Sequence, residues 1–171
     1  MDDVDRDQQT LLFRYPTSKA ASTSSADYIH PFVRLELGAR SDHWPSEEAS
    51  VSPYAAESFP NVFTEPTCRV HVLSAERTFW EKATLIHAWY HTPGEKKFRD
   101  RQSRHYYDLV RLFEHGIGKA AVQNTELLLK VAQHKSVFFA SASAKYDEAK
   151  PGSLRLVPPQ ARIAELEQDY R

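Results

Sequence analysis

The chain has 171 residues, of which 41% are hydrophobic, and a formal net charge of -1, which suits one ordinary domain with a small appendage. Its single cysteine, Cys68, excludes a disulfide framework and a cysteine-based zinc cluster within one chain, so we expect a reducing compartment, the cytoplasm. No apolar stretch approaches the roughly 20 residues that cross a bilayer, and 22 Lys+Arg against 23 Asp+Glu give no global cationic field. We therefore expect no membrane partner and at most a local nucleic-acid-binding patch.

Alternation of apolar and polar side chains predicts three strands in the first half of the chain. They cover residues 10–15, 32–37 and 68–73. In the second strand, Val33 and Leu35 share one face and Glu36 lies on the other. The intervening stretch 39–66 is polar and contains four of the 10 prolines, which predicts irregular structure with at most a short helix near Tyr54.

Helical periodicity dominates the second half. Ser74 stands at the N-cap position of the first helix, and Gly116 and Gly118 are expected to end the second. The second helix follows the basic segment 95–104, and its expected buried stripe consists of Tyr106, Leu109, Val110 and Phe113. The other three helices cover residues 75–91, 124–139 and 162–170. Strands followed by helices indicate an α+β protein, with a sheet region over 1–73 and a helical subdomain over 74–171.

Two isolated charged residues are candidates for chemistry. Glu36 projects from the polar face of its strand, where a carboxylate could hold Mg²⁺ or simply pair with Arg34 on the same face. Lys82 lies at the edge of the apolar stripe of the first helix. Its ammonium could reach a triphosphate, or it could extend to solvent beside Glu76 and Glu81.

The segment Ser103–Leu109, with the sequence SRHYYDL, concentrates polar and aromatic side chains. Arg104 and Asp108 are four residues apart and His105 and Asp108 three apart, so all three project from nearly the same side of a helix. They form either a functional cluster or a surface ion pair. His87 and His91 share a helix face, but no carboxylate lies between them, and we interpret them as packing or interface histidines.

Three blocks together resemble the AbiEii family of toxin nucleotidyltransferases, which includes toxins of type IV toxin–antitoxin systems. The blocks are VRLELGARS, ERTFWEKATLIH and SRHYYDL, at residues 33–41, 76–87 and 103–109. The resemblance extends from about Gln9 to Tyr170. It implies the remnant of a polymerase-β-like nucleotidyltransferase mixed sheet followed by a C-terminal helical subdomain.

The resemblance also implies roles for individual residues. Lys82 falls on the family's helix lysine, which contacts the nucleotide phosphates, and Asp108 falls on its polar active-site partner, so these two are the expected catalytic residues. Arg104 and His105 are expected to bind the nucleotide; His105 stands where many relatives have an aspartate. Glu36 is expected to be the third carboxylate of an Mg²⁺ site.

The family's glycine-serine or glycine-threonine block and its D-x-D strand are missing from this sequence. The chain therefore resembles the C-terminal portion of such a toxin, and we expect it to be inactive or nearly so alone. The implied reaction transfers a nucleotide from a nucleoside triphosphate to an RNA, such as tRNA, or to a protein. The alternative is a non-catalytic remnant that binds an antitoxin or another protein through exposed aromatics, among them Trp44, Trp89 and Tyr90.

Overall fold

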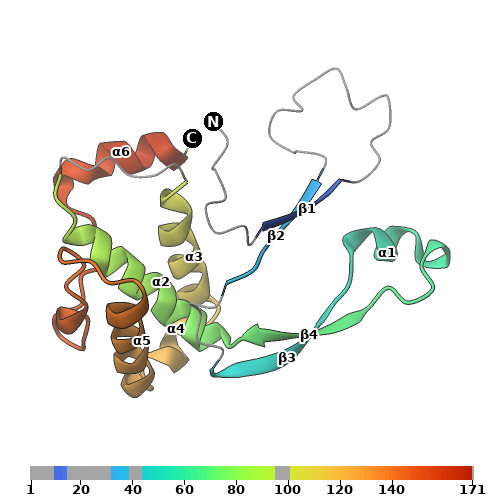
Figure 1. The fold of residues 1–171 in the computed structure, drawn as a ribbon, viewed down its shortest axis with the longest axis horizontal. Helices are drawn as coiled ribbons and strands as arrows, with labels where there is room; N and C mark the ends of the chain where they lie inside the picture. The colour runs from blue at the N-terminus through green and yellow to red at the C-terminus, as the bar shows by residue number, and fades with distance from the viewer. Residues whose placement is uncertain (1–9, 15–31, 39–43, 95–100, 171) are drawn as a thin grey trace. The chain divides into compact units, whose positions relative to one another are not determined.

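The computed structural model describes residues 10–14, 32–38, 44–94 and 101–170. The chain divides into two compact units, residues 1–41 and 42–171, and each is described by itself. The predicted boundary between residues 73 and 74 stays a prediction. In the first unit, β1 (Thr10–Arg14) and β2 (Phe32–Glu36) pair antiparallel (Figure 1).

The β1–β2 pair has one apolar face. Leu11 lies opposite Leu35 and Phe13 opposite Val33, and because side chains alternate along a strand, these four project to the same side. All four side chains are about half exposed. The predicted alternation in both strands is thus confirmed, and Tyr15 lies outside the described residues.

The second unit begins with a strand that the sequence analysis missed. β3 (Ser46–Val51) pairs antiparallel with β4 (Cys68–Leu73), so the prediction of irregular structure throughout 39–66 is wrong. Glu48 lies opposite His71 and forms a long ion pair with Arg69, at 3.9 Å. Both strands are largely exposed, and β3 needs few apolar side chains because backbone pairing with β4 holds it. The expected short helix near Tyr54 is confirmed as α1 (Tyr54–Ser58), followed by the 3-10 helix η2 (Pro60–Val62).

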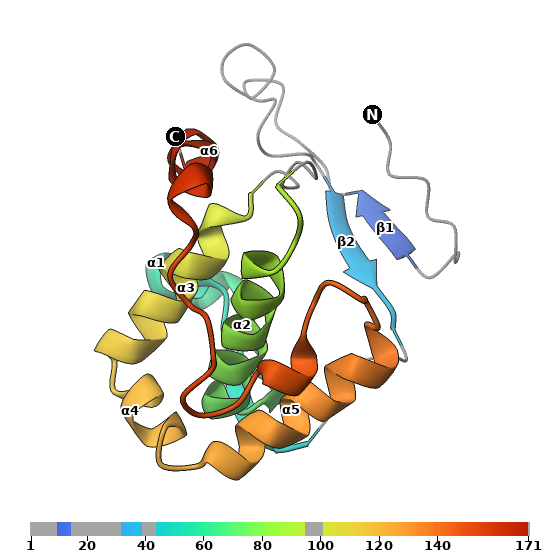
Figure 2. The ribbon, with the colours of Figure 1, turned by 90° about the vertical axis from the view of Figure 1, so that its left-hand side faces the viewer.

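Most of the second unit consists of helices around α2 (Ala75–Tyr90), which Figure 2 shows between α3 and α5. The other helical segments are α3 (Ser103–Glu114), α4 (Ile117–Ala121), α5 (Thr125–Phe138), the 3-10 helix η3 (Tyr146–Glu148) and α6 (Gln160–Tyr170). The N-cap prediction for Ser74 is confirmed, because its Oγ accepts a hydrogen bond from the Arg77 N–H at 3.2 Å. The described residues form an α+β protein, as predicted. None of their helices is long and apolar enough to cross a membrane.

The core lies where α2 meets α3, α4 and α5. Its buried apolar members are Phe79, Trp80, Ala83, Ile86, Leu109, Ala121, Leu127, Leu128 and Val131. On α3 the expected stripe is only partly buried: Leu109 is buried, but Val110 is 54% exposed and Phe113 46% exposed. The reason is that α3 faces α2 through Tyr106, Leu109 and Leu112, which turns Val110 away from the core.

The first residues of α3 are held by a carboxylate from α6. Asp169 accepts hydrogen bonds from the backbone N–H groups of Ser103, at 2.7 Å, and Arg101, at 2.5 Å. Burial alone would raise the pKa of Asp169, but these backbone donors at Ser103, Arg101 and Gln102 lower it overall. A side chain 66 residues away in sequence from Ser103 thus caps the helix that carries SRHYYDL.

Gly118 was predicted to end α3, but it lies inside α4, so that prediction is wrong. Gly116, with φ of 85°, makes the turn between the two helices. A Cβ at Gly118 would lie 2.9 Å from the Phe113 Cα and 2.9 Å from the Phe79 ring. The missing side chain therefore permits the close approach of α4 to both α2 and α3.

We predict that Gly118→Ala destabilises the fold. The added methyl meets backbone that cannot yield cheaply, and overpacking outweighs the gain in helix propensity, so the free energy of unfolding falls by about 1–2 kcal/mol. Urea denaturation measures this change. Gly94→Ala is the matched control, because a Cβ there meets nothing within 4 Å. Equal stability of the two variants would contradict the packing argument.

Candidate functional site

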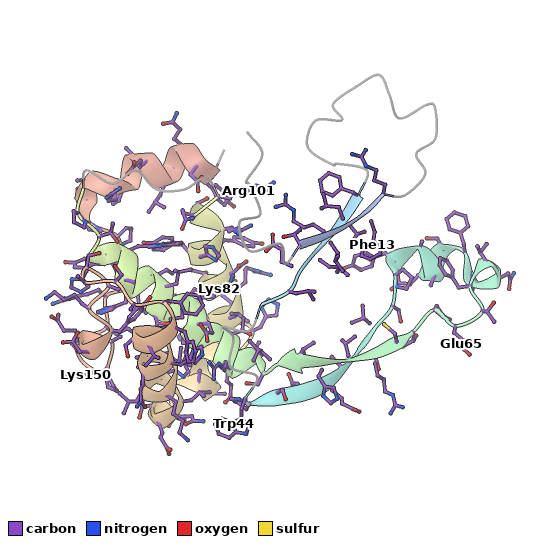
Figure 3. The ribbon with its side chains drawn as sticks, viewed as in Figure 1. Phe13, Trp44, Glu65, Lys82, Arg101 and Lys150 are labelled. Atoms are coloured by element: carbon purple, nitrogen blue, oxygen red, sulfur yellow. The ribbon has the colours of Figure 1, made fainter. Side chains whose placement is uncertain are left out.

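Lys82 on α2 and Asp108 on α3 form an ion pair across the helix interface. The Lys82 Nζ lies 2.8 Å from the Asp108 Oδ2, and the two side chains are 24% and 41% exposed. Figure 3 labels Lys82 on the central helix. Neither Glu76 nor Glu81, the partners suggested by sequence, provides this carboxylate. The two predicted catalytic residues are thus in contact although they are 26 positions apart.

His105 completes the cluster. Its Nδ1 lies 2.9 Å from the Lys82 Nζ, and because an ammonium can only donate, Nδ1 accepts and the ring proton belongs on Nε2. Burial, followed by the positive charges of Lys82 and Arg104, lowers the pKa of His105 from 6.5 to about 4. The imidazole is therefore neutral at physiological pH and orients the lysine without adding charge.

A cavity of about 440 Å³ opens beside this cluster. Its lining includes Lys82 and Thr78 from α2, and Asp108, Arg111 and His115 from α3. The His115 Nδ1 donates to the backbone carbonyl of Arg111 at 2.8 Å. Lys82 and Arg111 thus both line one cavity, and two cationic residues are a combination suited to a ligand rich in phosphate oxygens.

Adjacent to Lys82 on α2, Glu81 is the centre of a buried charge cluster. The Arg77 guanidinium donates to the Glu81 Oε1 at 3.0 Å, and the Lys135 Nζ lies 3.0 Å from the Glu81 Oε2. Arg77 is 1% exposed and also donates to the backbone carbonyl of Trp44. Burial lowers the pKa of Lys135 against the opposing effect of Glu81. The cluster joins α2 to α5 and to the residue that precedes the β3 region.

A second, apolar groove of about 520 Å³ lies between α3 and α6, lined by Tyr107, Val110 and Leu166 among others. It includes none of the predicted site residues. Lys82 and Asp108 instead line the cavity of about 440 Å³, together with Arg111.

The residues of this site lie in a chain that matches a known protein family. The family model described as nucleotidyl transferase AbiEii toxin, type IV TA system, matches residues 1–171. The chain belongs to the AbiEii family. No match is found among curated proteins or among solved structures. The matched range includes both blocks that meet at the site, the α2 block containing Lys82 and the α3 block containing Asp108.

The AbiEii resemblance implies Mg²⁺, and the described residues do not by themselves fit that ion. Among residues 10–14, 32–38, 44–94 and 101–170, no group of three or more His, Cys, Asp or Glu side chains could hold a metal. Glu36 belongs to the first unit, where its Oε1 lies 3.5 Å from the Arg34 Nη1. Its role as a metal ligand stays a prediction.

The interpretation of His87 as a packing residue is confirmed. His87 is fully buried, its Nδ1 accepts from the Arg155 N–H at 3.0 Å, and its Nε2 donates to the Lys145 carbonyl at 3.0 Å. Both ring nitrogens are therefore used within the fold, and neither is available to a metal ion. The ring of His91 packs against His87 edge-on at 4.7 Å.

Sequence reasoning placed Arg104 at the site but missed Arg111. Arg104 is exposed on α3 and acts on the cluster through its charge, which helps to lower the pKa of His105. Arg111 lies three residues after Asp108, so it occupies the same helix face. That spacing was the available signal, but an exposed arginine in a helix resembles any other surface cation.

We predict that His105 titrates at about 4 in the folded chain. Because the unfolded chain protonates it near 6.5, its neutral form contributes stability above pH 6.5, and this contribution is lost as the pH falls toward 4. Histidine NMR shifts recorded across this range measure the pKa. Lys82→Ala removes one of the charges that lower the pKa and should raise it, whereas titration near 6.5 in the intact chain would rule out the hydrogen-bonded arrangement.

We predict that Glu81→Gln destabilises the fold by about 3 kcal/mol, because it leaves Arg77 and Lys135 buried without their carboxylate. Thermal or urea unfolding at pH 7 measures the loss. Glu126→Gln is the control, since Glu126 forms an exposed i,i+4 pair with Lys130 at 2.9 Å and should change stability by no more than about 0.5 kcal/mol. Similar losses in both variants would show that the Glu81 cluster contributes no more to the free energy of unfolding than an exposed ion pair does.

Proposed function

We propose that the chain binds a nucleoside triphosphate at the Lys82–His105–Asp108 cluster and serves a nucleotidyltransferase reaction. The observation that carries this proposal is the contact of Lys82 with Asp108 beside a cavity, in a chain of the AbiEii family. Lysine is suited to phosphate groups because its ammonium is a compact charge with three donors. Asp108 and His105 take two of those donors and fix the position of the third.

In the proposed reaction an acceptor hydroxyl or phosphate oxygen attacks the α-phosphorus of the triphosphate. A new phosphorus–oxygen bond forms, the bond to the β-phosphate breaks, and pyrophosphate leaves. Lys82 would bind phosphate oxygens and stabilise their developing charge, with Asp108 orienting the ammonium and Arg104 adding positive potential. The acceptor would be an RNA, such as tRNA, or a protein, and the cytoplasm would supply the nucleotide.

Mg²⁺ and Glu36 enter this proposal only through the family. In nucleotidyltransferases of this kind a metal ion neutralises charge on the phosphates. Since this sequence has no D-x-D strand after a glycine block, we expect little or no turnover by the chain alone. Nucleotide binding, which needs the second unit's cations rather than a complete metal site, is the appropriate test.

A binding module is the second candidate, supported by exposed apolar surface. The β1–β2 pair presents Leu11, Phe13, Val33 and Leu35 on one half-exposed face, and Trp44 is 56% exposed. Trp89 and Tyr90, which the sequence suggested as exposed aromatics, are instead partly buried. A cognate antitoxin or another protein could cover such a face.

We predict that calorimetric titration of the chain with the four nucleoside triphosphates, each with and without Mg²⁺, detects binding of at least one. Lys82→Ala should weaken that binding at least about tenfold, because it removes a charge-assisted contact to phosphate. Lys130→Ala, which removes an exposed lysine from α5, is the control and should bind as the parent does. Absence of binding to a folded chain would favour the binding module.

A further inference from the structure

We propose that Arg111 is a second phosphate-binding residue of this site, and that Glu114 occupies its guanidinium until a polyphosphate displaces it. This inference rests on the proposed function, which assigns phosphate binding to Lys82, and extends phosphate binding to the terminal phosphates of the bound triphosphate. Arg111 and Lys82 come from different helices and line the same cavity, of about 440 Å³.

The spacing along α3 carries the first step. Asp108, Arg111 and His115 follow one another at intervals of three and four residues and all line the cavity. From Asp108 to His115 the helix rises about 10 Å, so this face extends well beyond the Lys82 ammonium. A ligand held only by Lys82 would leave most of it uncovered, whereas an extended polyphosphate would continue along it toward Arg111.

The pairing of Arg111 carries the second step. Its Nη1 lies 2.7 Å from the Glu114 Oε2, and the two side chains are 50% and 53% exposed. Exposed i,i+3 pairs of this kind contribute little stability. A phosphate group offers the guanidinium a bidentate acceptor with more negative charge than one carboxylate. Phosphate can therefore replace Glu114 as the partner of Arg111 at little cost. Breaking the buried Arg77–Glu81 pair would be costly by comparison.

The test uses inorganic tripolyphosphate as the probe, in calorimetric titrations at pH 7.5 without Mg²⁺. Arg111→Gln removes the guanidinium and should weaken binding about five- to tenfold. Glu114→Gln removes the competing carboxylate and should strengthen binding severalfold. Arg69→Gln is the matched control, because Arg69 is an exposed arginine on β4 in a 3.9 Å ion pair with Glu48 on β3, and this variant should bind as the parent does.

Opposite effects of Arg111→Gln and Glu114→Gln would support the proposal, since loss of structure cannot strengthen binding. If Lys82→Ala weakens nucleotide binding but neither α3 variant changes tripolyphosphate affinity, the role of Arg111 is overturned and the proposed function stands. If neither tripolyphosphate nor any nucleoside triphosphate binds the folded parent chain, both fail.

Discussion

The carboxylate of Glu81 is the constraint on which the helical unit depends. Two buried cations, Arg77 on the same helix and Lys135 on α5, pair with it, and loss of the carboxylate would leave both charges buried without an anionic partner. The pair with Lys135 on α5, and the hydrogen bond from Arg77 to the Trp44 carbonyl, restrict the rotation of α2 about its own axis. Because consecutive helix residues point about 100° apart, fixing the direction of Glu81 also fixes the direction of Lys82. The Lys82 side chain lies outside the Glu81 cluster and reaches Asp108 on α3.

The other half of the site depends on the position of α3. Asp169 receives backbone N–H groups at the start of this helix, and Leu109 packs into the core against α2. One contact holds the end of the helix and the other its middle, so Asp108, between them, is presented to Lys82 with little freedom. A polar site between two helices is thus positioned by interactions that lie outside it.

The sequence was sufficient for features with strong local signals and insufficient for those made by tertiary context. The alternating strands, the Ser74 cap and the pairing of Lys82 with the SRHYYDL segment could be predicted, the last with the help of the family resemblance. β3 could not, because its pairing with β4 replaces the apolar pattern that identifies a strand. Gly118 was misread as a helix end because its reason, the approach of Phe113 and Phe79, is visible only in three dimensions. Arg111 was missed because only the packing of α3 against α2 brings it to the same cavity as Lys82.

His105 has an electrostatic consequence for the proposed ligand. A carboxylate in place of this imidazole, beside Asp108, would give the cluster around Lys82 a net negative charge. The imidazole accepts the same kind of hydrogen bond from the ammonium, at 2.9 Å, but stays neutral because burial and the adjacent cations keep its pKa at about 4. Lys82 and Asp108 therefore balance, and the repulsion that a triphosphate would meet from the cluster is smaller by one unit charge. For the proposed triphosphate ligand, a neutral partner for the lysine favours direct contact between the ammonium and phosphate.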